Sequence, residues 1–420
     1  MLGNRIVSTS RRALGALFIG LALTGAALAQ QPLKIGFGMS LTGPLAGNGK
    51  AALIAMEIWR DDVNAKGGIL GRKVEFVYYD DQTSPATVPS IYTKLLDVDK
   101  VDLVVSGYGT NVIAPAMPIM MQRNLTFMTL FGLNVNSKFN YDRYFQIMPA
   151  GPNPAVGWSQ GFFDAAMSMN PKPKTVALVG ADAEYPAMAL EGAREHAKKT
   201  GLKIVYDKTY PPNTVDYSPI VRAIQAANPE VVFVASYPPD SAGMVRAANE
   251  VGLKTRIFGG GLVGPQFAAL KTQLGPLLNG VVNYEFYVPD LGSKFPFLDQ
   301  FLAKYQARAI VEKVDPLGFY LPPYAYAMMQ VLDQAITATK GLDQAKLAEY
   351  IHKNTFNTYV GRVGFAKNGE WAAPRVMMTQ YHGIIGNDVE QFKKPGRLTV
   401  LSPKEYKTGD LKAPYHENKK

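Results

Sequence analysis

Cysteine is absent from all 420 residues of the chain. This absence excludes disulfides, thiolate nucleophiles, cysteine metal sites and a lipid-modified cysteine near the N-terminus. Histidine is scarce, and none of the four lies four residues from another: His196, His352, His382 and His416. Because histidine metal sites usually use closely spaced ligands, no metal site is predicted.

Motifs for catalysis and for phosphate binding are also lacking. The chain has no G-x-S-x-G elbow, no P-loop and no G-x-G-x-x-G that opens a helix after the first predicted strand. The net charge of +10 is spread along the chain, without a basic stripe interleaved with aromatic residues, so a nucleic-acid partner is not expected. The sequence therefore predicts a protein that is not an enzyme and that needs no cofactor.

Only the N-terminus carries an apolar run, and it is short. Arg5, Arg11 and Arg12 precede the uncharged residues 13–23, and small residues stand at Ala27 and Ala29. A basic segment, an apolar core and small residues at −3 and −1 are typical of a secretory signal peptide. About 11 apolar residues are too few to cross about 30 Å of hydrocarbon. We expect cleavage after Ala29 and export to the periplasm, by the general or the twin-arginine route, with no membrane insertion afterwards.

After residue 30, strands and helices alternate twice. Buried-type strands separated by amphipathic segments predict parallel sheets covered on both faces. In the first half we expect strands at 33–39, 74–79, 102–105 and 126–130, and helices at 51–59, 88–96 and 114–123. In the second half we expect strands at 175–179, 203–206, 231–234 and 256–258, and helices at 188–199, 217–227 and 241–251.

The remaining stretch holds too little sheet for a third domain, and its elements are expected to return to the first two. The predicted fold is α/β, with two doubly wound parallel-sheet lobes joined by a three-segment hinge. The predicted division is a signal peptide (1–29), an N-terminal lobe (30–148 plus 281–356), a C-terminal lobe (149–280 plus 357–395) and a C-terminal tail (396–420).

Several stretches, in order along the chain, carry a family likeness. They are residues 35–46 (with Leu-Thr-Gly-Pro-Leu-Ala), 63–72 (Val-Asn-Ala-Lys-Gly-Gly-Ile-Leu-Gly-Arg), 80–85 (Asp-Asp-Gln-Thr-Ser-Pro), 183–185, 324–327, and 361–365 with 368–370. With these motifs the chain resembles the type I periplasmic binding proteins, in the leucine/isoleucine/valine-binding branch that also takes amides, urea and aromatic acids. The resemblance implies a protein that captures a small molecule by lobe closure and delivers it to a membrane-embedded ABC permease with a cytoplasmic ATPase. A sensor that docks on a receptor or kinase is the alternative.

Ligands of open α/β sheets bind beyond the carboxyl ends of the strands, which locates the expected site. Thr110 and Asn111 precede a predicted helix whose free N–H groups favour an anion, and the resemblance implies that Thr110 holds a carboxylate. The candidate ligand-binding residues are Thr42, Tyr108, Gly109, Thr110, Asn111, Phe131, Gly132 and Leu133 in the first lobe, and Glu184, Tyr185, Tyr237, Gly261 and Leu262 in the second.

Two positions depart from relatives that bind α-amino acids. The resemblance places an acid for the ammonium group at the position of Gly261, and a hydroxyl-bearing residue in the loop at 131–133. An aromatic, acid-poor pocket suits a ligand with an apolar body and one polar end. We therefore expect an aromatic or branched carboxylate or an amide, while Asp182 or Glu184 could supply the charge for an amino acid.

Overall fold

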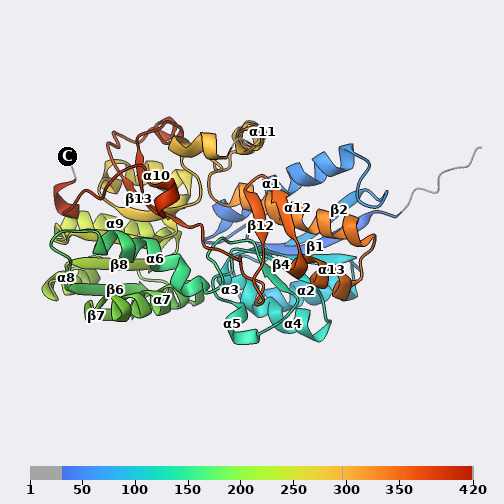
Figure 1. The fold of residues 1–420 in the computed structure, drawn as a ribbon, viewed down its shortest axis with the longest axis horizontal. Helices are drawn as coiled ribbons and strands as arrows, with labels where there is room; N and C mark the ends of the chain where they lie inside the picture. Colours follow the sequence, from blue (N-terminus) through green and yellow to red (C-terminus); the bar gives the residue numbers. More distant parts are fainter. Residues whose placement is uncertain (1–30, 296, 419–420) are drawn as a thin grey trace, which may run out of the picture.

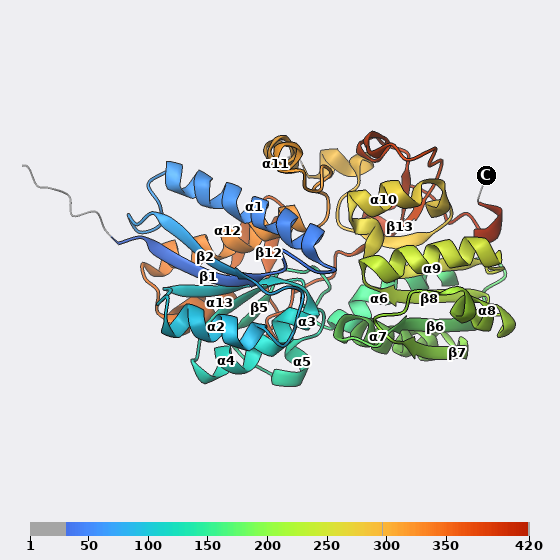
Figure 2. The same ribbon diagram turned by 180° about the vertical axis from the view of Figure 1, so that it is seen from behind.

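The computed structural model describes residues 31–295 and 297–418, which form two lobes side by side (Figures 1 and 2). The expected signal peptide lies outside the described residues. Both lobes are α/β, as predicted. No helix in the described part of the chain combines the length and apolar character needed to cross a membrane.

The N-terminal lobe is built on a five-stranded parallel sheet in the order β2-β1-β3-β4-β5. Its strands are β1 (Leu33–Met39), β2 (Val74–Asp80), β3 (Leu103–Tyr108), β4 (Phe127–Leu130) and β5 (Tyr144–Gln146), of which β5 was not predicted. Its first helices are α1 (Ala46–Ala65), α2 (Val88–Asp97), α3 (Thr110–Ile113), α4 (Met117–Gln122) and α5 (Asn136–Phe139). Pro115 and Pro118 fall inside the helix expected at 114–123. Since proline removes a backbone donor, short helices on either side of a 3-10 turn replace it.

The C-terminal lobe has a seven-stranded sheet in the order β14-β13-β10-β9-β8-β6-β7. The parallel strands are β6 (Thr175–Ala181), β7 (Lys203–Tyr210), β8 (Val231–Ser236), β9 (Ile257–Leu262) and β10 (Val282–Glu285). β13 (Met377–Tyr381) and β14 (Leu398–Ser402) extend the sheet in antiparallel pairing. Its helices are α6 (Pro154–Met167), α7 (Glu184–Thr200), α8 (Ser218–Ala226), α9 (Pro238–Val251) and α10 (Ala268–Leu274).

Later elements return to the first lobe. α11 (Leu298–Glu312) and α12 (Leu321–Thr339) pack against α1, while α13 (Gln344–Lys353) packs against α12. The hairpin of β11 (Thr355–Thr358) and β12 (Gly361–Gly364) also contacts α12. The chain therefore crosses between lobes after β5, after β10 and after β12 (Figure 1).

The structure places three segments elsewhere than the predicted boundaries. Residues 357–364 were assigned to the C-terminal lobe, but they belong to the hairpin of β11 and β12, which packs on α12 of the N-terminal lobe. Residues 281–285 were assigned to the N-terminal lobe, but β10 pairs with β9 and β13 in the second sheet. Residues 396–420 were predicted as a tail, but β14 completes that sheet and Tyr415 is buried against Phe258. These assignments rested on sequence position, whereas strand pairing and packing decide the lobe to which a segment belongs.

A buried ion pair lies under α10 of the C-terminal lobe. Lys271 Nζ is 3.0 Å from Glu285 Oε1, and the two side chains are 2% and 1% exposed. Tyr381 donates its hydroxyl to the same oxygen at 2.9 Å. Burial raises the pKa of the Glu285 carboxyl, and the nearby Lys271 ammonium opposes that rise. The pair joins α10 to β10 and β13.

The lobes also touch directly at the start of α1. Phe267, just before α10, sets its ring against Gly47 of α1, and a Cβ at Gly47 would lie 2.2 Å from the Phe267 Cζ atom. Only glycine leaves room for this approach. On another side, Lys138 of α5 forms a 3.0 Å ion pair with Glu184 of α7. The structure thus shows the lobes in contact.

Candidate functional site

A cavity of about 400 Å³ opens between the lobes at the carboxyl ends of their strands. Loops and first helical turns from both lobes form its walls, the arrangement expected for open α/β sheets. The N-terminal lobe contributes Pro44, Leu45, Thr83, Pro85 and Asn111; the C-terminal lobe contributes Asp182, Ala183, Glu184, Pro212, Tyr237, Pro239 and Asp240.

The loop after β1 is held in place by the end of β2. Asp80 accepts the backbone N–H groups of Leu41 and Thr42 at 3.0 and 3.1 Å, and the Thr42 hydroxyl at 2.6 Å. Partial burial raises the pKa of Asp80, but these hydrogen bonds outweigh it, so the pKa lies below its ordinary value. The predicted ligand residue Thr42 is exposed and donates to Asp80, outside the cavity lining.

Thr110 and Asn111 begin the short helix α3, and the structure separates their roles. Gly109 has a φ of 112°, which turns the chain into the helix. The buried Thr110 Oγ1 accepts the Leu133 backbone N–H at 3.0 Å, and Thr110 is absent from the cavity lining. Asn111 does line the cavity, and its Oδ1 atom is buried without a hydrogen bond. The N-terminal wall therefore offers a free acceptor.

The opposite wall carries acidic groups. Asp182 is exposed, Glu184 pairs with Lys138, and Asp240 is 4% exposed. Burial raises the pKa of Asp240 to about 6, and the Tyr210 hydroxyl, which donates to it at 3.3 Å, partly offsets this. Asp240 is therefore ionised at neutral pH in a site that disfavours its charge.

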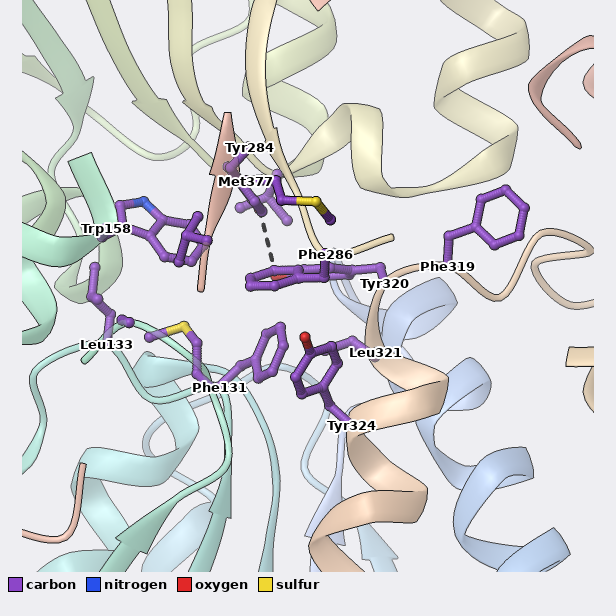
Figure 3. Packing of buried hydrophobic residues seen from close by; sticks show 14 of the residues in the cluster. Phe131, Leu133, Trp158, Tyr284, Phe286, Phe319, Tyr320, Leu321, Tyr324 and Met377 are labelled. Atoms are coloured by element: carbon purple, nitrogen blue, oxygen red, sulfur yellow. Dashed lines mark hydrogen bonds between the residues drawn. The ribbon is translucent and has the colours of Figure 1, made fainter. Parts of the chain in front are cut away.

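Tyr108, Phe131 and Tyr185, three of the four predicted aromatic residues, are buried in an aromatic cluster. Figure 3 shows Phe131 in this cluster, beside Tyr320 and Tyr324. Phe131 contacts Phe286, Tyr320 and Tyr324, with ring centroids 5.0, 5.3 and 5.2 Å away. Tyr108 and Tyr320 share a hydroxyl hydrogen bond of 3.1 Å. The described members from both lobes and their crossings are Tyr108, Phe131, Trp158, Tyr185, Tyr284, Phe286, Tyr320 and Tyr324.

The remaining predicted residues support this cluster or the sheet below it. Tyr185 donates its hydroxyl to the Gly261 carbonyl at 2.8 Å, and Leu262 is fully buried. The Gly132 carbonyl accepts from Tyr144 at 3.2 Å, and Leu133 is buried. Of the predicted set, Asn111, Glu184 and Tyr237 line the cavity. Their assignment to ligand binding stays a prediction.

Sequence reasoning missed Asp240 and the aromatic residues around β10. Asp240 follows β8 by four residues, within the first turn of α9, so the rule that ligands lie after strands could have included it. Tyr284 and Phe286 were missed because residues 281–287 were assigned to the other lobe.

Tyr320→Phe tests the hydrogen bonds that the Tyr320 hydroxyl makes within the aromatic cluster. The change removes the hydroxyl that pairs with Tyr108 at 3.1 Å and accepts from Tyr284 at 3.5 Å. Since these hydroxyls are buried, the free energy of unfolding should fall by about 1–3 kcal/mol, measured by urea denaturation. Tyr78→Phe, where the half-buried ring packs on Phe37, is the control and should change little. Equal stability of the Tyr320 variant and the wild type would contradict a role for this bond.

A family model described as "Periplasmic binding protein" matches residues 32–383. The leucine-, isoleucine-, valine-, threonine- and alanine-binding protein of Pseudomonas aeruginosa is 27% identical over 372 residues, covering 85% of this chain and 92% of that protein. The Leu/Ile/Val-binding protein of Escherichia coli K12 is 25% identical over 365 residues, covering 86% and 93%.

Solved structures share the fold at lower identity. A solute-binding protein of an ABC transporter from R. palustris, in complex with benzoate, aligns with a TM-score of 0.72 at 17% identity, covering 89% of this chain and 97% of that one. A leucine-binding protein from Thermotoga maritima aligns with a TM-score of 0.71 at 19% identity, covering 88% and 97%.

Proposed function

Because the chain belongs to the periplasmic binding protein family, we propose that it captures a small amphipathic solute between its two lobes and delivers it to an ABC permease. The observation that carries this proposal is the cavity of about 400 Å³ whose walls come from both lobes. A ligand there contacts both walls at once, so binding favours the closed arrangement.

The relatives support the transport role and the range of solutes. Proteins named for leucine, isoleucine and valine binding match most of the chain, and fold neighbours include one in complex with benzoate. The family consists of binding proteins. In keeping with this, we propose that the site contacts a solute and does not catalyse a reaction on it. The periplasm is the proposed location, since the N-terminal segment has the pattern of a signal peptide.

This function is tested by measuring whether a solute binds the protein and also closes its lobes. A panel of branched and aromatic amino acids, their acids, amines and amides, and urea would be added to the mature protein, residues 30–420. A captured solute should raise the melting temperature, because ligand that binds only the folded state stabilises it by mass action. The same solute should reduce the radius of gyration in small-angle X-ray scattering. A solute that raised the melting temperature without compaction would contradict capture by closure.

Lys138→Ala gives a milder test of the closed arrangement. Lys138 and Glu184 are 49% and 43% exposed, and exposed ion pairs contribute only about 0–1 kcal/mol. The affinity for a captured solute should therefore fall by at most about fivefold, measured by calorimetry. A loss of all binding would show that this pair, and not the cavity, holds the lobes together.

A further inference from the structure

The walls of the cavity between the lobes present acceptors and negative charge, and none of the described residues that line it is Lys, Arg or His. On the N-terminal side, the Asn111 Oδ1 atom is buried without a hydrogen bond. Buried polar atoms are normally paired, so this atom indicates where a ligand completes the site.

The charged groups around the cavity are helix ends and carboxylates. Two long helices, α7 and α9, begin at its wall, and each N-terminus carries roughly half a positive charge. Glu184 is neutralised by Lys138, while Asp182 and Asp240 bring a full negative charge each when ionised. The acids therefore outweigh the helix ends by about one charge. The net negative charge would repel a carboxylate that enters the cavity and would attract a cation.

Asp240 is the acid best placed to hold such a cation. It is 4% exposed and lines the cavity. Its carboxylate accepts hydrogen bonds from the Tyr210 and Tyr217 hydroxyls and from the backbone N–H groups of Tyr237 and Asp240, and no cation lies among these groups. A buried carboxylate without a cation lowers stability. Such a cost is typical of a group kept for binding.

From this geometry we infer that the cavity binds solutes through a protonated amine, which donates to Asp240 on one lobe and to Asn111 on the other. The inference rests on the proposed function and narrows its range of solutes. Four prolines, Pro44, Pro85, Pro212 and Pro239, line the rest of the cavity and suit an apolar body. Asp240 thereby supplies the acidic group for the amine, which the family resemblance places at the position of Gly261.

Two matched sets of compounds test the amine. Leucine, 3-methylbutylamine and 4-methylpentanoate share a branched body, while phenylalanine, phenethylamine and 3-phenylpropanoate share an aromatic one. By calorimetry at pH 7.5, in at least one set, we expect the amine, the amino acid or both to bind at least tenfold more tightly than the acid. Comparing amine with amino acid shows whether a carboxylate is tolerated beside the amine. An acid that binds as tightly as its amine-bearing counterparts would overturn the inference.

Asp240→Asn separates binding from folding. The amide costs less to bury than the carboxylate, so the melting temperature should equal or exceed that of the wild type. The affinity for the amine-bearing solute should fall at least tenfold. The control is Asp164→Asn in α6, an exposed acid of the same lobe that lines a different cavity, and it should retain affinity. Unchanged affinity in folded Asp240→Asn protein would overturn the inference.

The proposed function and this inference can fail separately. If all six compounds are silent while a solute of the wider panel that lacks an amine compacts the protein, the inference is wrong and the function stands. If no solute of the wider panel compacts the protein, the proposed function fails, and the inference fails with it.

Discussion

Lys271→Met should lower the free energy of unfolding by about 3–5 kcal/mol, the range found when one partner of a buried ion pair is removed. Lys271 and Glu285 lie 3.0 Å apart and are almost fully buried. Methionine fills the space of the aliphatic stem but leaves the Glu285 carboxylate without a cation, with hydrogen bonds from Tyr381 and Gln266 only. Urea denaturation followed by circular dichroism measures the loss.

The double variant Lys271→Met/Glu285→Leu is the control for this prediction. Replacing a buried ion pair by apolar residues is often close to neutral, so the double variant should be more stable than the single one. A single variant as stable as the wild type would show that the pair is dispensable. If the double variant is instead less stable than Lys271→Met, the apolar replacement fails to pack and the cost assigned to the lone carboxylate is wrong.

The pH dependence of Lys271→Met follows from the same group. Burial already raises the pKa of Glu285 in the wild type, and loss of the ammonium removes the opposing effect. The folded variant therefore holds a proton that the unfolded chain releases near pH 4.3. Its stability relative to the wild type should fall as the pH rises from about 4 through the folded pKa. A loss of stability that is the same at pH 4.5 and pH 8 would contradict this account.

Gly47→Ala should weaken solute binding by roughly 5- to 150-fold, while leaving the open protein folded. A Cβ at Gly47 would lie 2.2 Å from the Phe267 ring on the other lobe, so the lobes cannot close as they do in this structure. Overpacking of this kind costs about 1–3 kcal/mol, which corresponds to that change in affinity. Alanine also favours the helix over glycine, so the melting temperature without solute should not fall. Calorimetry with the captured solute provides the measurement.

Two further variants show whether the ring is the cause. Gly341→Ala adds a methyl group in open space on the N-terminal lobe and should keep full affinity. Adding Phe267→Ala to Gly47→Ala removes the obstacle and should recover part of the lost affinity. If Gly47→Ala binds like the wild type, the lobes close by a path that does not need this contact.

The alternation of apolar strands with amphipathic helices predicted the two sheets, because buried parallel strands read as continuous apolar runs. β5, with three residues, was too short to give a pattern. The sequence could not show that residues 282–285 belong to the second sheet, since the partners of β10 come from residue 257 onwards and from residue 377 onwards. Such pairing over long separations depends on tertiary packing and leaves no local signal.

The sequence predicted the position of the site in the fold better than it predicted the side chains that line the site. Strand ends located Asn111, Glu184 and Tyr237, which all line the cavity. The prediction that Thr110 holds a carboxylate rested on a family position, and in the structure its hydroxyl oxygen accepts a hydrogen bond from Leu133. An acid-poor pocket was expected because Gly261 replaces an acid. The acid on the wall, Asp240, comes from a different loop, and no local pattern distinguishes it from a residue that complements a helix end.

The threefold crossing of the chain also sets the order in which the molecule can be assembled. The N-terminal lobe needs α11 to α13, and the C-terminal lobe needs β13, β14 and the buried Tyr415. A chain that emerges N-terminus first therefore completes neither lobe before its last quarter is available, and β10 waits about ninety residues for β13. Contacts so distant along the chain slow folding. A slowly folding chain remains unfolded for longer, which is the state that the general export route, one of the two predicted routes, requires.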